Sequence, residues 1–117
     1  PVAVEPMALA AGETRELIII ADAHAPAIRH LAITLAAGAA LRLTLVDAAG
    51  EARPYGRTAI DVTCHAGADF QLGAILIGTG AQVVELVTTV RHVGPAATSR
   101  QTVRAVAGGT ATTSYLG

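Results

Sequence analysis

The chain has 117 residues, of which 52% are hydrophobic and only 3% aromatic, and a formal net charge of −1, so a single domain over residues 1–117 is predicted. Its eight basic residues are scattered without aromatic residues between them, and apolar runs such as residues 17–21 are too short to cross a bilayer. This excludes an obvious nucleic-acid face and a membrane span. The single Cys excludes an internal disulfide and fits a reducing compartment, so we expect a cytoplasmic protein.

Turn signals recur along the chain at intervals of about 14 residues, the length of one strand and one turn. Between these signals apolar and polar residues alternate with period two, which is typical of half-buried strands. In chain order, clear examples are residues 31–35, 41–45 and 60–64, in which Leu, Ile and Val point inward. The turn signals lie at Gly12, Ala25-Pro26, Gly38, Gly50, Gly67, Gly80, Gly94 and Gly108-Gly109.

A longer repeat joins these units in pairs. Residues 7–12, 33–38 and 62–67 each end in Gly, and their starts lie 26 and 29 residues apart. A repeat too short to bury its own apolar face must stack on its neighbours, so two strands per coil predict an all-β, flattened β-helix. The alternative is an antiparallel β-sandwich or jelly roll, which also has regularly spaced turns. The β-helix predicts that interior side chains stack from coil to coil, with Leu31, Ile33 and Leu35 over Ile60 and Val62.

One interval is longer than the others. Residues 47–56 include Pro54, which cannot donate a hydrogen bond to a strand ladder, so this segment predicts a protruding loop. The best helical candidate, residues 36–45, is better explained as strand, turn and strand, because Arg42 and Thr44 alternate with leucines.

Four His and one Cys are the strongest metal-ligand types in the chain. His24 falls in a predicted turn and His30 at a strand start, where solvated side chains are expected. Cys64 and His65 are adjacent on a strand and therefore point to opposite faces, so they cannot chelate one ion. Cys64 belongs to the inward set and is expected to act as a small apolar residue.

His65 and His92 lie two positions before Gly67 and Gly94, one presumed coil apart. In register, their imidazoles would stack about 4.8 Å apart on neighbouring strands. The alternation of Leu86, Thr88 and Val90 instead indicates that this strand is shifted by one residue in its pairing. Such a shift would turn His92 inward. Zinc normally takes three or four protein ligands, so His65 and His92 are weak candidates and no tightly bound metal is expected.

Catalytic patterns are not found in the sequence. It has no Gly-x-Ser-x-Gly elbow, no phosphate-cradling glycine loop and no His-Glu-x-x-His motif. A cupin-type metal enzyme would need a His-x-His strand, and none exists. Ser99 and His92 straddle the Gly94-Pro95 turn without an orienting acid or an oxyanion hole, so the chain is not expected to be an enzyme.

The segment from residue 81 to residue 117 carries the most specific pattern of the chain. It combines a strand ending at His92 with a turn, a Thr-Ser-x-Gln sequence, a second glycine turn and a closing aromatic. This pattern resembles the SufB/SufD family, the scaffold proteins of the SUF iron–sulfur cluster assembly system, and looks more like the SufD branch. The residues that carry the resemblance are His92, Pro95, Thr98, Ser99, Gln101, Tyr115 and Gly117. The family's usual Gly is replaced by Ala105, and its usual charged residues by Gly108 and Thr110.

The resemblance implies a fold, a function and partners. It implies a right-handed parallel β-helix core that forms one part of a larger SufD-like protein. The parent would be a non-catalytic scaffold that works with SufB-like and SufC-like (ATPase) subunits. An iron–sulfur cluster would then belong to the assembled complex, with no cofactor bound by this chain alone. Further coils, and then the family's ATPase-binding helical domain, would follow Gly117.

A second class of function fits the same fold expectation. A structural or polymerising β-helix of the bactofilin type would use the unpaired strands at the ends of the solenoid for association. The same exposed ends predict that this chain associates with itself.

Overall fold

The computed structural model describes residues 2–21, 28–48, 55–78, 83–108 and 112–116. All the regular elements in these ranges are β-strands, and the strands over residues 40–47, 55–64 and 69–78 show the alternating burial that a period-two sequence predicts. No helix in this described part of the chain is long and apolar enough to span a membrane. In chain order the strands are β1 (Val2–Leu9), β2 (Thr14–Ala21), β3 (Ile28–Leu35), β4 (Ala40–Asp47), β5 (Tyr55–Cys64), β6 (Asp69–Gly78), β7 (Val83–His92), β8 (Thr98–Ala107) and β9 (Thr112–Leu116).

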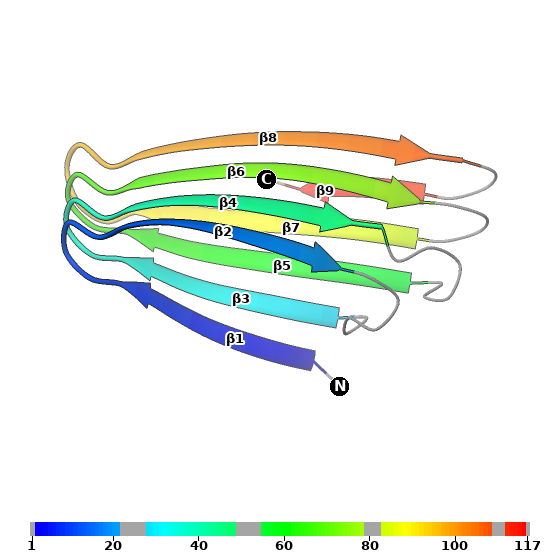
Figure 1. Ribbon diagram of the computed structural model, residues 1–117, viewed down its shortest axis with the longest axis horizontal. Helices are drawn as coiled ribbons and strands as arrows, with labels where there is room; N and C mark the ends of the chain where they lie inside the picture. The colour runs from blue at the N-terminus through cyan, green and yellow to red at the C-terminus, as the bar shows by residue number, and fades with distance from the viewer. Residues whose placement is uncertain (1, 22–27, 49–54, 79–82, 109–111, 117) are drawn as a thin grey trace.

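Consecutive strands alternate between two sheets, as Figure 1 shows. The odd-numbered strands form a five-stranded sheet in the order β1-β3-β5-β7-β9, and the even-numbered strands form a four-stranded sheet in the order β2-β4-β6-β8. Neighbouring strands pair in parallel in both sheets. The chain is therefore a β-solenoid with two strands per coil, as the repeat predicted, and the antiparallel sandwich alternative is wrong.

The interior side chains stack in register from coil to coil. Leu31 lies level with Ile60 and Ile33 with Val62, so the predicted stacking is confirmed. The buried leucine, isoleucine and valine side chains of both sheets point between the layers, where burial of apolar area supplies the main stabilisation. The largest fully buried side chains are Phe70, Leu9, Leu31, Leu35, Leu41, Leu43, Leu45, Ile60, Leu76, Leu86 and Val62.

The turns from the five-stranded to the four-stranded sheet also stack. Gly12, Gly38 and Gly67 have φ of 72°, 69° and 68°, a left-handed backbone that glycine adopts without steric cost. Their backbones hydrogen-bond along the stack, with the Gly12 amide donating to Ala37 and the Gly38 amide donating to Ala66. The predicted 26- and 29-residue repeat is thus built on this turn.

The fourth turn of this edge differs from the other three. Its left-handed residue is Ala96, with φ of 61°, and not Gly94 as the glycine spacing suggested. Val93 occupies the level of His65, since its amide donates to the Cys64 carbonyl, whereas Pro95 accepts from the Gly67 amide. Gly94 is therefore one extra residue in the turn. A Cβ there would lie 2.4 Å from the Ala66 amide nitrogen, so the close backbone approach explains the glycine.

The predicted loop over residues 47–56 is wrong at both ends, since Asp47 is the buried last residue of β4. Tyr55 and Gly56 belong to β5 and pair with Val83 and Val84 of β7, because the strand alternation already begins there. Pro54 lies outside the described residues, as do the turn signals at Ala25-Pro26, Gly50 and Gly80.

Candidate functional site

At the coil of β7 and β8, several inward positions near the fourth turn carry polar residues in place of the apolar residues of the preceding coil. Phe70 and Leu72 of β6 are buried, and the residues level with them on β8 are Ser99 and Gln101. The same change occurs in the other sheet, where Ile60 of β5 lies level with Thr88 of β7. This part of the coil therefore places hydroxyl, amide and imidazole groups at inward positions.

Two hydrogen bonds join the two sheets within this polar layer. The Thr88 hydroxyl donates to Gln101 Oε1 over 2.7 Å, and His92 Nε2 lies 3.2 Å from Ser99 Oγ. Thr88 is only 3% exposed, so its hydroxyl needs such a partner, whereas His92 and Ser99 are exposed at the rim. We call these four residues, His92, Ser99, Thr88 and Gln101, the polar end layer.

The pairing of β7 with β5 sets the orientation of His92. His92 pairs with Cys64, whose side chain is fully buried, so His92 occupies an inward position. The one-residue shift in strand pairing that the sequence indicated is therefore confirmed. The alternative prediction, in which His92 stacks on His65, is wrong. Because adjacent residues of a strand face opposite sides, one shifted residue moves the imidazole from outside to inside.

The other metal candidates do not join His92. His65 is exposed in the third turn, while Cys64 faces the core. Burial, reinforced by the negative charge of Asp69, raises the pKa of the Cys64 thiol and keeps it protonated. Among the described residues, no three His, Cys, Asp or Glu side chains gather closely enough to hold a metal ion.

The remaining residues singled out from the sequence lie elsewhere. Thr98 points outward on β8, where its hydroxyl donates to Asp69 Oδ1 over 2.7 Å. Pro95 holds the fourth turn through its carbonyl, and the backbone of Tyr115 pairs with Leu86. His30 lies on the outer face of the five-stranded sheet, 2.5 Å from Asp61 Oδ2. His24 and Gly117 are outside the described residues.

The polar end layer offers hydrogen-bond donors and acceptors but no complete catalytic set. His92 and Ser99 are within hydrogen-bond distance, and no carboxylate of a described residue bonds to His92 to orient it as a base. The exposed side chains of His92 and Ser99 can also form hydrogen bonds to another polar surface.

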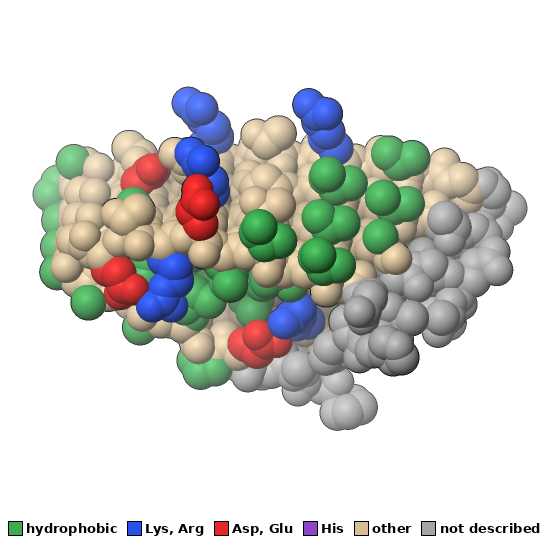
Figure 2. Space-filling view, viewed as in Figure 1, with side chains coloured by type: hydrophobic (Ala, Val, Ile, Leu, Met, Phe, Trp, Pro, Cys, Tyr) green, Lys and Arg blue, Asp and Glu red, His purple; other side chains and the backbone are tan. Residues whose placement is uncertain are grey.

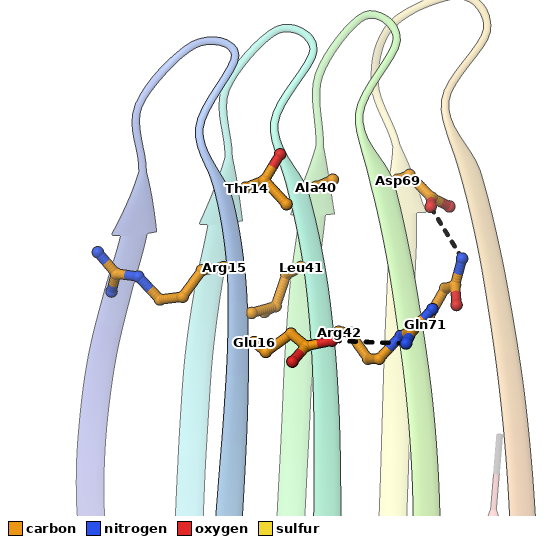
Figure 3. Close-up of a pocket in the computed structure, with 8 residues that line it drawn as sticks. All are labelled: Thr14, Arg15, Glu16, Ala40, Leu41, Arg42, Asp69 and Gln71. Carbon is orange, nitrogen blue, oxygen red and sulfur yellow. Dashed lines mark hydrogen bonds and ion pairs between the residues drawn. The ribbon is translucent and has the colours of Figure 1, made fainter.

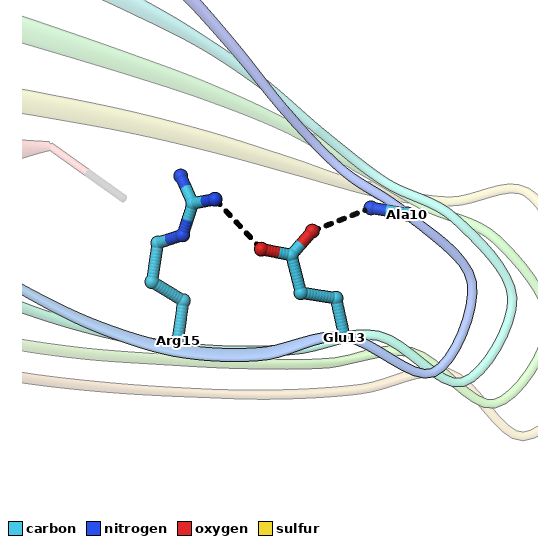
Figure 4. A network of polar contacts seen from close by, with 3 residues as sticks. All are labelled: Ala10, Glu13 and Arg15. Carbon is cyan, nitrogen blue, oxygen red and sulfur yellow. Dashed lines mark hydrogen bonds and ion pairs between the residues drawn. The ribbon is translucent and has the colours of Figure 1, made fainter.

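A separate hollow of about 180 Å³ lies near the turns on the outer face of the four-stranded sheet (Figure 3). Its charged side chains are already paired: Arg42 with Glu16 over 3.4 Å, and Asp69 with Gln71 over 3.1 Å. Arg15, which also lines the hollow, donates to Glu13 over 2.6 Å, and Glu13 accepts from the Ala10 amide over 2.9 Å as well (Figure 4). These bonds lower the pKa of Glu13, with the backbone bond as the larger cause. The hollow therefore has little unsatisfied charge to offer a ligand.

Sequence reasoning missed the role of two residues. In the sequence Thr88 is only one residue of an apolar alternation, although a Thr at an inward position of a buried strand is itself a signal of a polar interior contact. Asp69 belongs to no specific motif of the sequence, yet it accepts hydrogen bonds from side chains on its own strand and on β8. Neither position stands out without knowledge of which coil lies next to it.

Neither a scan against protein-family models nor searches of the curated proteins and of the solved structures found a match to this chain.

Proposed function

We propose that this chain is the β-helix core of a non-catalytic scaffold of the SUF iron–sulfur cluster assembly system, closest to SufD. In this proposal it acts in the cytoplasm with a SufB-like subunit and a SufC-like ATPase. The cluster is then built by the assembled complex, and the chain alone holds no cofactor. A scaffold of this kind works by presenting a rigid surface, which the in-register solenoid provides.

The observation that carries the proposal is the convergence of the family-like residues. His92, Ser99 and Gln101 were selected from a linear pattern, and the fold brings all of them to inward positions of one coil. Thr88 completes the set by its bond to Gln101. Polar side chains at inward positions lower the stability of the protein unless they have hydrogen-bond partners. A functional reason for placing them there is therefore expected.

The proposal assigns the polar end layer to contact with the SufB-like subunit. We expect the full-length parent protein to capture the SufB-like protein of the same genome in a pull-down, and Gln101→Leu to weaken this capture about tenfold. Gln71→Leu is the matched control, because Gln71 lies on the outer face of β6, and it should leave capture unchanged. If the intact parent protein does not capture the SufB-like protein at all, the proposal is wrong.

Binding of the SufC-like ATPase provides a second test. The resemblance assigns this contact to a helical domain beyond Gly117, so residues 1–117 alone should not capture the ATPase, whereas the parent protein should. Stoichiometric capture by residues 1–117 would assign the ATPase contact to the solenoid itself and would contradict this part of the proposal.

A structural or polymerising β-helix of the bactofilin type is the second candidate. The observation in its favour is that β2 and β8 are the outer strands of the four-stranded sheet, so each has one edge unpaired among the described residues. Parallel strands of a second copy could extend the sheet at these edges, which also predicts self-association. Electron microscopy of the purified parent protein separates the candidates, because a filament former polymerises without any SUF partner.

A further inference from the structure

The outer face of the four-stranded sheet has features that the chain's own packing does not explain. Ile18 and Ile20 on β2 are 69% and 66% exposed, and Val106 on β8 is 59% exposed. Ile75 on β6 is 40% exposed. Figure 2 shows apolar side chains gathered on this side of the molecule, with arginine side chains projecting beside them. Contiguous exposed apolar side chains on a soluble domain are typical of an interaction surface.

Gly73 forms the floor of a hollow in the middle of this face. Two adjoining recesses of about 200 Å³ each share Gly73, Thr44 and Thr102 in their walls. Gly73 does not have a left-handed φ, and a Cβ built on it would meet no atom within 4 Å. Neither backbone conformation nor crowding therefore requires glycine, although glycine weakens the interior of a strand. A glycine of this kind often marks a place where another molecule approaches closely.

The arginine side chains around the hollow differ in whether they have an ion-pair partner. Arg42, Arg100 and Arg104 line it, and only Arg42 has an ion pair, with Glu16 over 3.4 Å. Arg100 and Arg104 form no ion pair with any described residue. The other nearby carboxylate, Asp69, already accepts hydrogen bonds from Thr98 and Gln71. The hollow therefore presents two unpaired cations beside apolar side chains.

The width of the apolar surface decides what could cover it. Ile20 on β2 and Ile75 on β6 are separated by two strand spacings, about 10 Å. An extended peptide covers only about 4.8 Å of this width, whereas an α-helix with its side chains is about 10–12 Å wide. Helices are also what usually covers the faces of parallel sheets. Nucleic acid would need stacking aromatics, and the outward residues of this sheet include none.

The spacing of the arginines fits the same occupant. Arg100 and Arg104 are four residues apart on β8, about 13 Å, with Thr102 and Gly73 level with the midpoint. On a helix, two acidic residues placed four positions before and four after an apolar residue lie on one face and span about 12 Å. We infer that this face binds an acidic amphipathic helix of a partner protein. An apolar side chain of that helix enters the Gly73 hollow, and its flanking carboxylates pair with Arg100 and Arg104.

The test uses a defined helical peptide as the probe. A fluorescein-labelled, alanine-rich peptide would carry a leucine with glutamates four positions to either side, and a matched peptide would carry lysines in place of the glutamates. We expect the anisotropy of the acidic peptide to rise with added protein, and the rise to weaken with salt. Gly73→Leu and the double variant Arg100→Glu/Arg104→Glu should each weaken binding about tenfold or more.

Two controls separate this surface from general effects. Arg57→Glu alters one charge on the other sheet and should change the affinity less than about twofold, and thermal unfolding checks that Gly73→Leu folds. Equal binding of the lysine peptide, equal binding to Gly73→Leu, or no binding of the acidic peptide would each overturn the inference. Self-association that Gly73→Leu abolishes would assign the face to a second copy instead. Binding of phosphatidylserine vesicles that needs the same arginines would assign it to a membrane, and both results would refute the helix.

Discussion

The fourth turn allows a quantitative test of how the solenoid is built. Ala96 adopts φ of 61° at the place where the other three turns have glycine. A left-handed backbone costs a residue with a Cβ about 1–2 kcal/mol. Replacing Ala96 by Gly removes this cost, while the greater freedom of glycine in the unfolded chain offsets about 0.4–1 kcal/mol of the gain. We therefore expect Ala96→Gly to raise the free energy of unfolding by about 0.5–1 kcal/mol.

A matched set of variants makes this expectation sharp. Ala37→Gly is the control, because Ala37 is an exposed turn residue without positive φ, so this change should destabilise the protein by about 0.4–1 kcal/mol. Gly38→Ala should lower stability by about 1 kcal/mol, because φ is 69° there although space is available. Gly94→Ala should cost more, about 2 kcal/mol or above, since its Cβ would lie 2.4 Å from the Ala66 amide nitrogen and 2.8 Å from Ala66 Cα.

Urea unfolding followed by circular dichroism measures all four changes, and thermal unfolding should shift by about 4 °C per kcal/mol for a domain of this size. The order of stability should be Ala96→Gly above wild type, then Ala37→Gly and Gly38→Ala, then Gly94→Ala. If Ala96→Gly destabilises the protein as much as Ala37→Gly does, or if Gly94→Ala is neutral, the assignment of the extra residue in the fourth turn is wrong.

Three further predictions follow from buried and charged groups. Ile33→Asp should cost several kcal/mol because it buries an unpaired carboxylate at a site only 2% exposed, which the same urea titration would detect; a small effect would contradict the coil assignment. Glu13 has a lowered pKa, so its contribution to stability is present above its unfolded pKa and is lost as pH falls through the lower folded value. Wild type should therefore lose its advantage over Glu13→Gln on acidification, and a pH-independent difference would refute this. The pKa of Cys64 is raised, so the folded state binds the thiol proton more tightly and stability should fall as pH rises above about 9. Its reaction with a thiol reagent should need unfolding, and rapid labelling of the native protein would exclude a buried thiol.

Three residues of the polar end layer are identified by the linear pattern, and their arrangement is given by the fold. The linear pattern selected His92, Ser99 and Gln101, but a pattern does not state which faces of which strands they occupy. The fold adds that they lie on one layer together with Thr88, joined by hydrogen bonds of 2.7 and 3.2 Å. A variant that removes the Gln101 amide therefore tests the motif and the layer together.

The sequence alone determined the local rules of this protein. Period-two alternation specifies strands, and the spacing of Gly12, Gly38 and Gly67 specifies a coil of two strands, because a strand's faces and a left-handed turn are both properties of a few neighbouring residues. The stacking of Ile33 on Val62 follows from the same repeat. These features could be predicted because each depends on residues close together in the chain.

Only the tertiary structure decided the register of the fourth turn and which of the two orientations of His92 left open by the sequence is correct. In this turn glycine is needed at Gly94, where the backbone approaches Ala66 closely, and the left-handed position is occupied by Ala96. The spacing of glycines in the sequence cannot distinguish these two roles. The outer face around Gly73 was likewise hidden, because its side chains come from four strands that are far apart in the sequence. Which residues share a surface is set by the pairing of coils, and one inserted residue is enough to change it.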